Sequence, residues 1–402
     1  MGQILFLGGF VLNKFMKALS YILAFSLGAF IMTGYIYYRL GGKASTGVSK
    51  LDQLETIIDE RFIEDVDMTA LEDAAADAMV TATGDRWSYY IPASQYASYV
   101  EQMQNAYVGI GVTIQPSEEP AGLEVVQVTA GGPAEAAGIQ VFDVIVEAEG
   151  QNCSEIGMEE TRNIIRGEAG TQVQLTINRQ GETLEFTVTR EKIDVPVATY
   201  EVLDSGYGLI TISNFDSKCA HETIAAIEEL MEQNVKGIVF DVRFNPGGYK
   251  HELVEVLDYI LPEGPLFRSE TYDGKTETDT SDAGHIEIPM AVLVNGDSYS
   301  AAEFFAAALQ EYDYAIVVGE KTCGKGYFQN TITLSDGSAV ALSVGKYFTP
   351  NGVSLAGVGI TPDVTVEVDE DTYAAIYGRT LEPSEDPQLQ AAISALNSAD
   401  LP

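Results

Sequence analysis

Hydrophobic and polar residues follow four successive patterns along the chain. Residues 18–38 form one uninterrupted apolar run, and residues 51–83 repeat apolar positions at the spacing of a helix. From residue 107 to 195 the chain has short β-branched runs separated by Gly, Pro and polar turns. From residue 200 onward, strand-like and helix-like runs alternate. These patterns predict an α/β protein with an N-terminal helical part and an inserted β-rich module.

The apolar run, ALSYILAFSLGAFIMTGYIYY, contains 21 residues and no charge. A helix of that length spans about 30 Å, the thickness of the hydrocarbon core of a bilayer. Tyrosines near its end suit the membrane interface. The run is long for the apolar part of a signal peptide, and no small-residue cleavage motif follows it. We therefore expect an uncleaved transmembrane signal anchor, which with its linker occupies residues 1–45.

The charges that flank this anchor leave its direction open. Lys14 and Lys17 precede the run, and Arg39 and Lys43 follow it, so the positive-inside rule does not decide. Translation from Met16 would also give an ordinary anchor, so the start stays open between that residue and the first one.

Residues 46–103 are predicted to form a helical segment. LDQLETIIDERF, which begins at Leu51, places Leu and Ile on one stripe, as in an amphipathic helix. The stretch GDRWSYYIP then breaks the pattern with a turn and carries the only tryptophan, Trp87. A second, shorter helix is expected over residues 93–104.

The β-rich module is predicted to span residues 104–195 and the α/β domain residues 196–378. Five strands are expected in the module, together with one helix over residues 159–167. The α/β domain should have a sheet with crossover connections. Its expected strands are 206–213, 235–243, 290–296 and 314–320. An amphipathic helix is expected in the C-terminal segment, residues 379–402.

Composition narrows the classes of function. The chain has 402 residues, 46% of them hydrophobic, and a formal net charge of −38. This size suits two or three packed domains, and such an acidic surface disfavours binding to nucleic acid. The three cysteines are scattered and form no CxxC pair, and there is no HExxH motif. We therefore expect no metal site and no cofactor.

Ser300 is the first candidate for chemistry. It lies in the turn GDSYS, between the apolar strand MAVLVN and a hydrophobic helix. In open α/β sheets, catalytic groups collect at the carboxyl ends of strands, and a helix N-terminus offers N–H groups to a developing oxyanion. The alternative is structural, because Ser300 and Glu303 also fit a helix capping box. The three histidines are distant in sequence, so a nucleophilic serine would need another base.

Two further turns offer what such a serine would need. Lys325 lies between two glycines after the next strand, and burial lowers a lysine pKa enough for the amine to act as a base. A Ser–Lys pair requires no histidine. After the strand VFDVR, Gly247 and Gly248 can bring a backbone N–H close to an oxyanion. Taken singly, each has an ordinary alternative, a surface lysine or a plain turn.

In this order and spacing, these segments resemble the carboxyl-terminal processing (tail-specific) serine peptidases. The matching stretches are SYSAAEF, TCGKGYFQ, DVRFNPGG and KYFTPNGVSLAGVGITPDV. The resemblance implies a crotonase/ClpP-like α/β core with Ser300 as nucleophile, Lys325 as general base and Gln329 as the residue that orients the lysine. It also implies an oxyanion hole from three backbone positions, Ala301, Gly247 and Gly248.

The β-rich module resembles the PDZ domain of the same peptidases, through the stretches AGGPAEAAGI and VFDVIVEAEG. Loop N–H groups can bind a C-terminal carboxylate while a strand edge pairs with the peptide. The resemblance implies that the loop YVGIGV binds the peptide in this way. The residues of this loop are Tyr107, Val108, Gly109, Ile110, Gly111 and Val112.

The chain departs from the family pattern in three places. Phe142 stands where a glycine is usual before Asp143, Cys323 replaces an aromatic residue beside Lys325, and Ala302 stands where a second serine is common. None of these changes removes a residue that the resemblance implies to be catalytic.

These observations support three hypotheses of function. The first is a membrane-anchored serine endopeptidase that grips the C-terminal tail of an unfolded or tagged protein through its PDZ domain. The second is a catalytically silent peptide-binding scaffold, and the third is a protease that releases one defined partner. The resemblance implies a single-pass protein of a bacterial cytoplasmic membrane, with its catalytic part outside the cytoplasm. The helical segment would also allow a homodimer.

Overall fold

The computed structural model describes residues 49–398. Where the sequence suggested a continuous helical stretch, two helices form, α2 (Lys50–Arg61) and α3 (Met68–Thr81). Neither has a buried residue, and Leu54 of the predicted apolar stripe is 53% exposed. Within the described part of the chain, every helix is too short or too polar to cross a bilayer. The predicted anchor, residues 18–38, lies outside that part.

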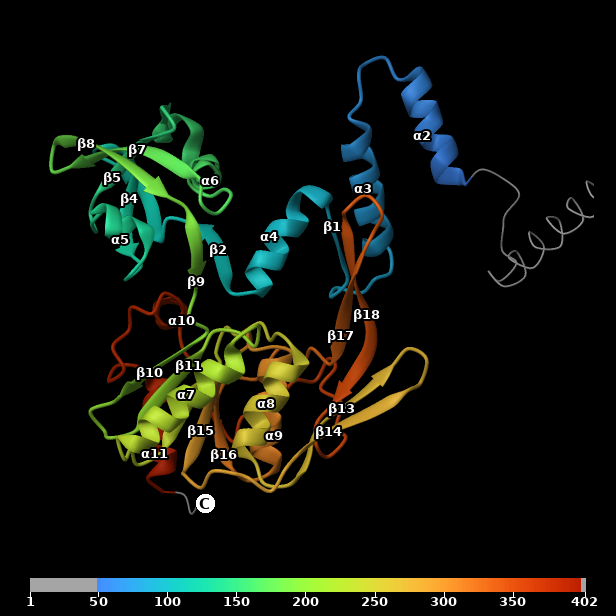
Figure 1. Cartoon of the computed structure of the whole chain (residues 1–402). Coiled ribbons are helices and arrows are strands. Elements are labelled where there is room, and N and C mark those ends of the chain that lie inside the picture. Colours follow the sequence, from blue (N-terminus) through green and yellow to red (C-terminus); the bar gives the residue numbers. More distant parts are fainter. Residues whose placement is uncertain (1–48, 399–402) are drawn as a thin grey trace, which may run out of the picture. The chain divides into compact units, whose positions relative to one another are not determined.

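The β-rich module forms a twisted antiparallel sheet from the strands that its β-branched runs predicted (Figure 1). Its main path is β3 (Val112–Glu118), β4 (Ala121–Val128), β5 (Val144–Ala148), β7 (Gln172–Arg179) and β8 (Glu182–Thr189). The short strand β6 (Gln151–Asn152) pairs with β5, and β2 (Ala106–Gly109) pairs separately with β9 (Glu191–Asp194). Since β3 is the edge strand, one side of it has no strand partner among residues 49–398.

Two helices complete the hydrophobic core of this module. They are α5 (Pro133–Ala137) and α6 (Cys153–Ile165). The second is kinked at Gly157, which has φ 81° and ψ 170°; the part after the kink matches the predicted helix, and the Asn152 side chain caps the part before it by accepting the Ser154 N–H. The core contains fully buried Val125, Ile145 and Leu175. The module therefore has its own hydrophobic core, separate from that of the α/β domain.

The α/β domain is built on a six-strand sheet. Its order is β10 (Ala198–Val202), β11 (Gly208–Ile212), β12 (Ile238–Asp241), β15 (Met290–Val294), β16 (Ala315–Gly319) and β19 (Val364–Thr365). Only β10 is antiparallel to its neighbour, and the other strands run parallel. The alternating strand and helix pattern therefore predicted the central sheet correctly.

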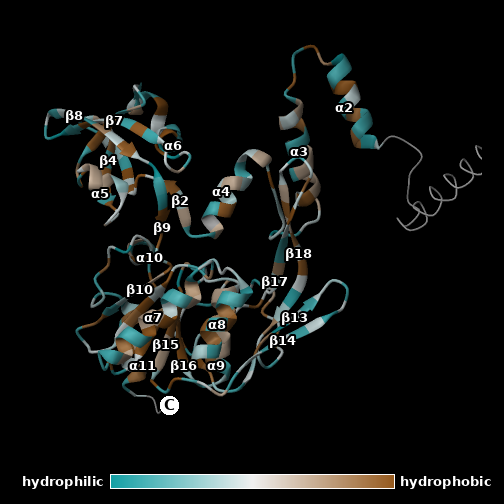
Figure 2. Ribbon diagram, viewed as in Figure 1, coloured by the Kyte–Doolittle hydropathy of each residue, from teal (hydrophilic) through white to brown (hydrophobic). Residues whose placement is uncertain are grey.

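Helices cover both faces of this sheet, as Figure 1 shows. The helices α7 (Cys219–Glu232), α8 (Lys250–Ile260) and α9 (Ala301–Glu311) share one core with Phe240 of β12. On the opposite face α11 (Pro387–Leu396) packs with Val239. The central strands are buried on both faces, which explains their continuous hydrophobic colour in Figure 2. The C-terminal helix thus completes the α/β domain. A further helix, α10, spans Glu370–Tyr377.

A second sheet was not foreseen from the sequence. It joins β1 (Tyr89–Ile91), β18 (Ala339–Phe348), β13 (Gly264–Thr271) and β14 (Thr276–Ser281), and β17 (Tyr327–Thr333) also pairs with β18. Two of its strands, β14 and β17, have mostly exposed side chains, so they lack the apolar runs that mark a strand in sequence. The predicted short helix follows β1 as α4 (Ala93–Met103).

Candidate active site

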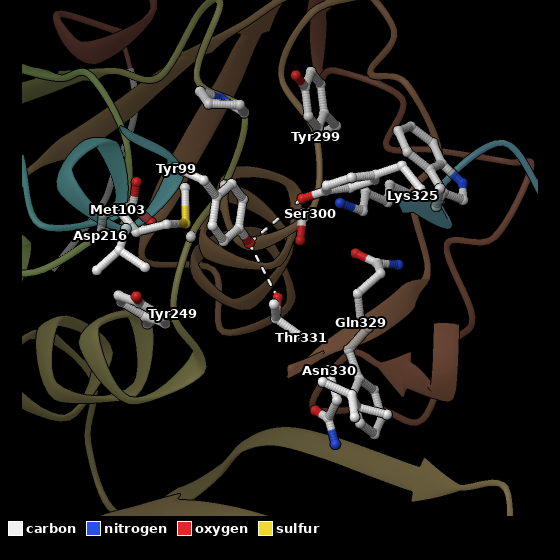
Figure 3. Close-up of a pocket in the computed structure, with 18 of the residues that line it drawn as sticks. Tyr99, Met103, Asp216, Tyr249, Tyr299, Ser300, Lys325, Gln329, Asn330 and Thr331 are labelled. Carbon is white, nitrogen blue, oxygen red and sulfur yellow. Dashed lines mark hydrogen bonds between the residues drawn. The ribbon is translucent and has the colours of Figure 1, made fainter. Parts of the chain in front are cut away.

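Three turns meet at the carboxyl ends of neighbouring parallel strands. β12 leads to the Gly247–Gly248 turn, β15 to Ser300, and β16 to the loop that holds Lys325. This is the edge of the sheet at which the sequence predicted catalytic groups. The three turns line one cavity of about 790 Å³. In Figure 3, Ser300, Lys325 and Gln329 all face this cavity.

Ser300 has a backbone conformation that side-chain-bearing residues rarely adopt. As the N-cap of α9 it has φ 58° and ψ −126°. Gly247 packs directly against it, since a Cβ at Gly247 would lie 2.6 Å from the Cβ of Ser300. Only glycine fits there. Ser300 is 7% exposed, so it is held against the glycine turn at the start of a helix.

The fully buried Glu303 joins the serine turn to the lysine loop. Its Oε2 accepts the N–H groups of Ser300 (3.0 Å) and Lys325 (2.8 Å). Its Oε1 accepts the Thr322 hydroxyl (2.6 Å) and the Gly324 N–H (2.7 Å). Burial raises the pKa of this carboxyl, and these four hydrogen bonds oppose that effect. The predicted capping role of Glu303 was therefore only part of its function, because it fixes both turns together.

The Lys325 amine is desolvated and has no internal counter-ion. Its Nζ lies 4.9 Å from the ring centre of Trp87 and 5.8 Å from that of Tyr299. It forms no hydrogen bond or ion pair with any residue in the described range 49–398. Burial lowers its pKa, and the nearby Cys323, Glu303 and Asp85 oppose that shift. The neutral amine is thus more accessible than in a surface lysine.

Gln329 is held by a chain of polar side chains. Its Nε2 donates to the Ser343 Oγ (3.0 Å) on the opposing strand β18 and to the carbonyl of Tyr327 (3.2 Å). The Ser343 N–H in turn donates to the Ser88 Oγ, and that hydroxyl donates to Asp85 Oδ2 (2.6 Å). With the amide nitrogen occupied, the Gln329 carbonyl oxygen is the group left to accept a hydrogen bond in the cavity.

The structure narrows the predicted oxyanion hole. The Gly247 N–H already donates to the Asn245 side chain (2.8 Å), so the prediction that it could donate to an oxyanion is wrong. Gly247 serves instead as the small residue against Ser300. The N–H groups of Gly248 and Ala301 form no hydrogen bond with the described residues. Both residues are at the serine turn or its facing glycine turn, so these two donors remain available.

A second serine and a second lysine lie close in sequence to Ser300 and Lys325, but their surroundings differ from those of Ser300 and Lys325. Ser298 is completely buried, and its hydroxyl donates to the carbonyl of Val242 (2.8 Å). Lys321 is exposed to solvent. Cys323, the departure noted beside the lysine, accepts a hydrogen bond from Arg86 at 3.1 Å.

The predicted peptide-binding loop divides into three parts. Tyr107, Val108 and Gly109 lie in β2 and pair with β9. Ile110 is 1% exposed and its side chain belongs to the core of the module, so only its backbone could take part in the predicted binding of a carboxylate. Gly111, with φ 79°, turns the chain into β3, which begins at Val112 and has the open edge. The edge of β3 is thus the surface available for strand addition.

Phe142, which stands where the family pattern has a glycine, preserves the local turn. Phe142 has φ 72°, the conformation in which glycine is usual, and its side chain is 76% exposed. Asp143 next to it is buried and paired with Arg179 at 2.6 Å. The turn therefore keeps its shape without the glycine.

The arrangement has the parts needed for acyl transfer. A serine lies at a helix N-terminus, an unpaired amine with a lowered pKa shares its cavity, and two backbone N–H groups are free. Sequence spacing pointed to the serine, the lysine and the glutamine. It gave no sign of Trp87, which lines the cavity from a distant part of the chain, or of Ser343, which holds Gln329 from the opposing strand.

Comparisons with known proteins bear on both domains. Residues 206–366 match the model of peptidase family S41, and residues 124–179 match that of the PDZ domain. The carboxy-terminal processing protease CtpA of Bacillus subtilis is 32% identical over 338 residues, which cover 82% of this chain and 72% of that protein. A probable CtpA-like serine protease of Staphylococcus aureus is 33% identical over 340 residues, 83% of this chain and 68% of that protein.

Among solved structures, a putative S41 protease from Bacteroides fragilis has a similar fold. It is 17% identical, with a TM-score of 0.53, and the match covers 86% of this chain and 97% of that one.

Proposed function

Because this chain belongs to peptidase family S41, as a serine protease of the carboxy-terminal processing group, we propose that Ser300 and Lys325 form its catalytic dyad. One observation carries the proposal. The Lys325 amine is desolvated, lacks a counter-ion among the described residues, and faces the same cavity as Ser300. A lysine with a lowered pKa holds a free electron pair at lower pH than a surface lysine does, and a general base requires that electron pair.

The dyad would work by two acyl transfers. The neutral Lys325 Nζ takes the Ser300 hydroxyl proton as Oγ attacks the scissile carbonyl carbon, which forms a tetrahedral oxyanion. The N–H groups of Gly248 and Ala301 stabilise that oxyanion. The C–N bond then breaks, and Lys325 gives its proton to the leaving amine. Water, deprotonated by Lys325, hydrolyses the acyl-serine ester and restores both groups.

Gln329 would position the lysine. Because its amide nitrogen is held by Ser343 and Tyr327, its oxygen can accept a hydrogen bond from the Lys325 amine. This contact would keep the amine directed toward Ser300 in both protonation states.

The PDZ domain would bind the substrate tail. The open edge of β3 supports this proposal, since an extended peptide can add to it as a further strand. The turn at Gly111, just before β3, is the place where loop N–H groups would meet the terminal carboxylate. Recognition would then depend on a free C-terminus.

Membrane attachment rests on the sequence alone. The uncharged run at residues 18–38 supports a single-pass anchor, and the family suggests a catalytic part on the outer face of a bacterial cytoplasmic membrane. A homodimer is proposed through α2, on which Leu51, Leu54 and Ile57 are at least 41% exposed. Sedimentation at several concentrations tests this, and a protein that stays a monomer throughout would contradict it.

The direct test of the proposed function is cleavage by the full chain. An unfolded protein with an apolar C-terminus should be cut by the natural sequence and by Lys321→Ala, in which an exposed lysine is removed. The Ser300→Ala and Lys325→Ala variants should be inactive. Amidating the substrate C-terminus should slow cleavage. Cleavage by Ser300→Ala would contradict the dyad, and tail binding without any cleavage would favour the scaffold hypothesis.

A further inference from the structure

Asp216 is a buried acid in the wall of the active cavity, and the dyad makes no use of it. It lies in the loop between β11 and α7 and lines the same cavity as Ser300. Its relative exposure is 4%, and its Oδ1 has no hydrogen-bond partner among residues 49–398. Figure 3 shows it beside Tyr249 and Met103, at the end of the cavity away from Lys325. A buried, unpaired polar oxygen is costly, so its presence requires an explanation.

The position of Asp216 is fixed against the proposed oxyanion turn. The Phe215 N–H donates to the Gly247 carbonyl, and the Tyr249 N–H donates to the Phe215 carbonyl, both at 2.7 Å. A Cβ at Gly248 would lie 2.6 Å from the Asp216 nitrogen. The Asp216 backbone therefore touches the turn that would bind the reacting carbonyl. A substrate residue close to the scissile bond would come within reach of its side chain.

Other side chains already cap the nearby helix and pair with the nearby lysines, so the Asp216 carboxyl has neither of these structural roles. The N–H groups of Lys218 and Ala220 at the start of α7 donate to Glu252, so Asp216 does not cap this helix with its side chain. The Lys218 amine pairs with Asp194 at 2.6 Å. Lys250, the first residue of α8, pairs with Glu277 and Asp279. Among the described residues, no cation pairs with Asp216.

We propose that Asp216 forms a subsite that accepts a basic side chain, lysine or arginine, of the substrate near the scissile bond. The proposal rests on the proposed protease function of the same cavity. The cationic group of the substrate would be the counter-ion that Asp216 lacks among the described residues. The Tyr249 and Tyr99 rings and Met103, which line the same wall, would pack against the aliphatic stem.

The charge of this subsite should depend on pH. Burial, and then repulsion from Glu252, raise the pKa of Asp216 to about 7. The other titratable groups around it are Tyr249, Tyr89 and Cys219, and burial raises the pKa of each, so they stay neutral in this range. Attraction for a basic side chain should therefore strengthen as pH rises through 7.

Peptide cleavage by the full chain tests the subsite. A series of peptides carries either lysine or norleucine, which lacks the charge, at each position on both sides of the bond that is cut. At one position kcat/KM should favour lysine by roughly tenfold or more at pH 8. The ratio should be smaller at pH 6. Because both peptides use the same dyad, the titration of Lys325 cancels from this ratio.

Two neutral variants complete the design, the near-isosteric Asp216→Asn and the smaller Asp216→Ser. Both should bring the lysine-to-norleucine ratio near one and abolish its pH dependence. A ratio near one at every position in the natural sequence, or an unchanged ratio in the variants, would overturn the subsite. An unpartnered acid that only donates its proton to a peptide carbonyl would give that result.

The experiments distinguish a failure of the proposed dyad from a failure of the proposed subsite. If Ser300→Ala still cleaved, the proposed function would fall while the ratio could still be measured. If nothing cleaved, the affinities of Ser300→Ala for the same two peptides replace kcat/KM. Tighter binding of the lysine peptide, lost on adding Asp216→Asn, supports the subsite, and equal affinities overturn it.

Discussion

At the scale of single residues, the environment of Lys325 is more informative than its place in a motif. The sequence identified a lysine between two glycines, but not what surrounds it. Trp87 and Tyr299, which come from different parts of the chain, border the amine and shield it in part from water. Spacing along the chain carries no information about such neighbours. The lowered pKa follows from these contacts and is therefore a structural finding.

This environment predicts the pH dependence of the enzyme. Only the neutral amine is a base, so kcat/KM should rise with pH. Because burial lowers the Lys325 pKa, the rise should be centred below the ordinary lysine value of about 10.4. Trp87→Ala should move the midpoint to higher pH by admitting water, whereas Lys321→Ala should leave it in place. A pH profile that is flat, or that falls as pH rises, would contradict a lysine base.

At the scale of elements, Glu303 determines how two turns fit together. The capping box in the sequence predicted the contact with Ser300, which the structure contains. The contacts to Thr322, Gly324 and Lys325 could not be predicted, because they depend on how the β16 loop returns to α9. One local motif thus indicated the residue, and the tertiary structure defines its role.

Glu303→Gln should cost both stability and activity. The amide that replaces one carboxylate oxygen cannot accept an N–H, so two of the four donors lose their partner. We expect a loss of about 2–4 kcal/mol in the free energy of unfolding, measured by denaturant titration, and a large loss of kcat. Thr322→Val removes one donor to the carboxylate and also the acceptor of the buried Ile360 N–H, so it should cost about 1–3 kcal/mol in stability but much less in kcat. Equal stability of Glu303→Gln and the natural protein would show that the hydrogen bonds to Glu303 do not hold the two turns together.

Strands were predictable where they are buried and not where they are exposed. The runs at β12, β15 and β16 are apolar because helices cover both faces of their sheet. The strand β14, TETDTS, and the strand β17 have mostly exposed side chains, so no hydrophobic period marks them. This second sheet nevertheless supplies Gln329 and its partner Ser343. The sequence motif identified Gln329 but did not predict the sheet that holds it.

At the scale of the whole molecule, the family assignment joins a protease core to a PDZ domain. The order of the two domains followed from the change in hydrophobic pattern near residue 200. The sequence did not show which side chains of the peptide-binding loop are buried, and packing places that of Ile110 in the core of the module. The acid at Asp216 likewise has no sequence signal, since its meaning comes from its contact with the glycine turn.

The central claim is that Ser300 acts as a nucleophile activated by Lys325. The most direct measurement is to acylate the full chain with a peptide ester at alkaline pH, quench it in acid, and map the modified residue by mass spectrometry. We predict one acyl group, on Ser300, and much slower acylation of the Lys325→Met variant. An acyl group on any other residue, or equal rates in the two proteins, would contradict the dyad.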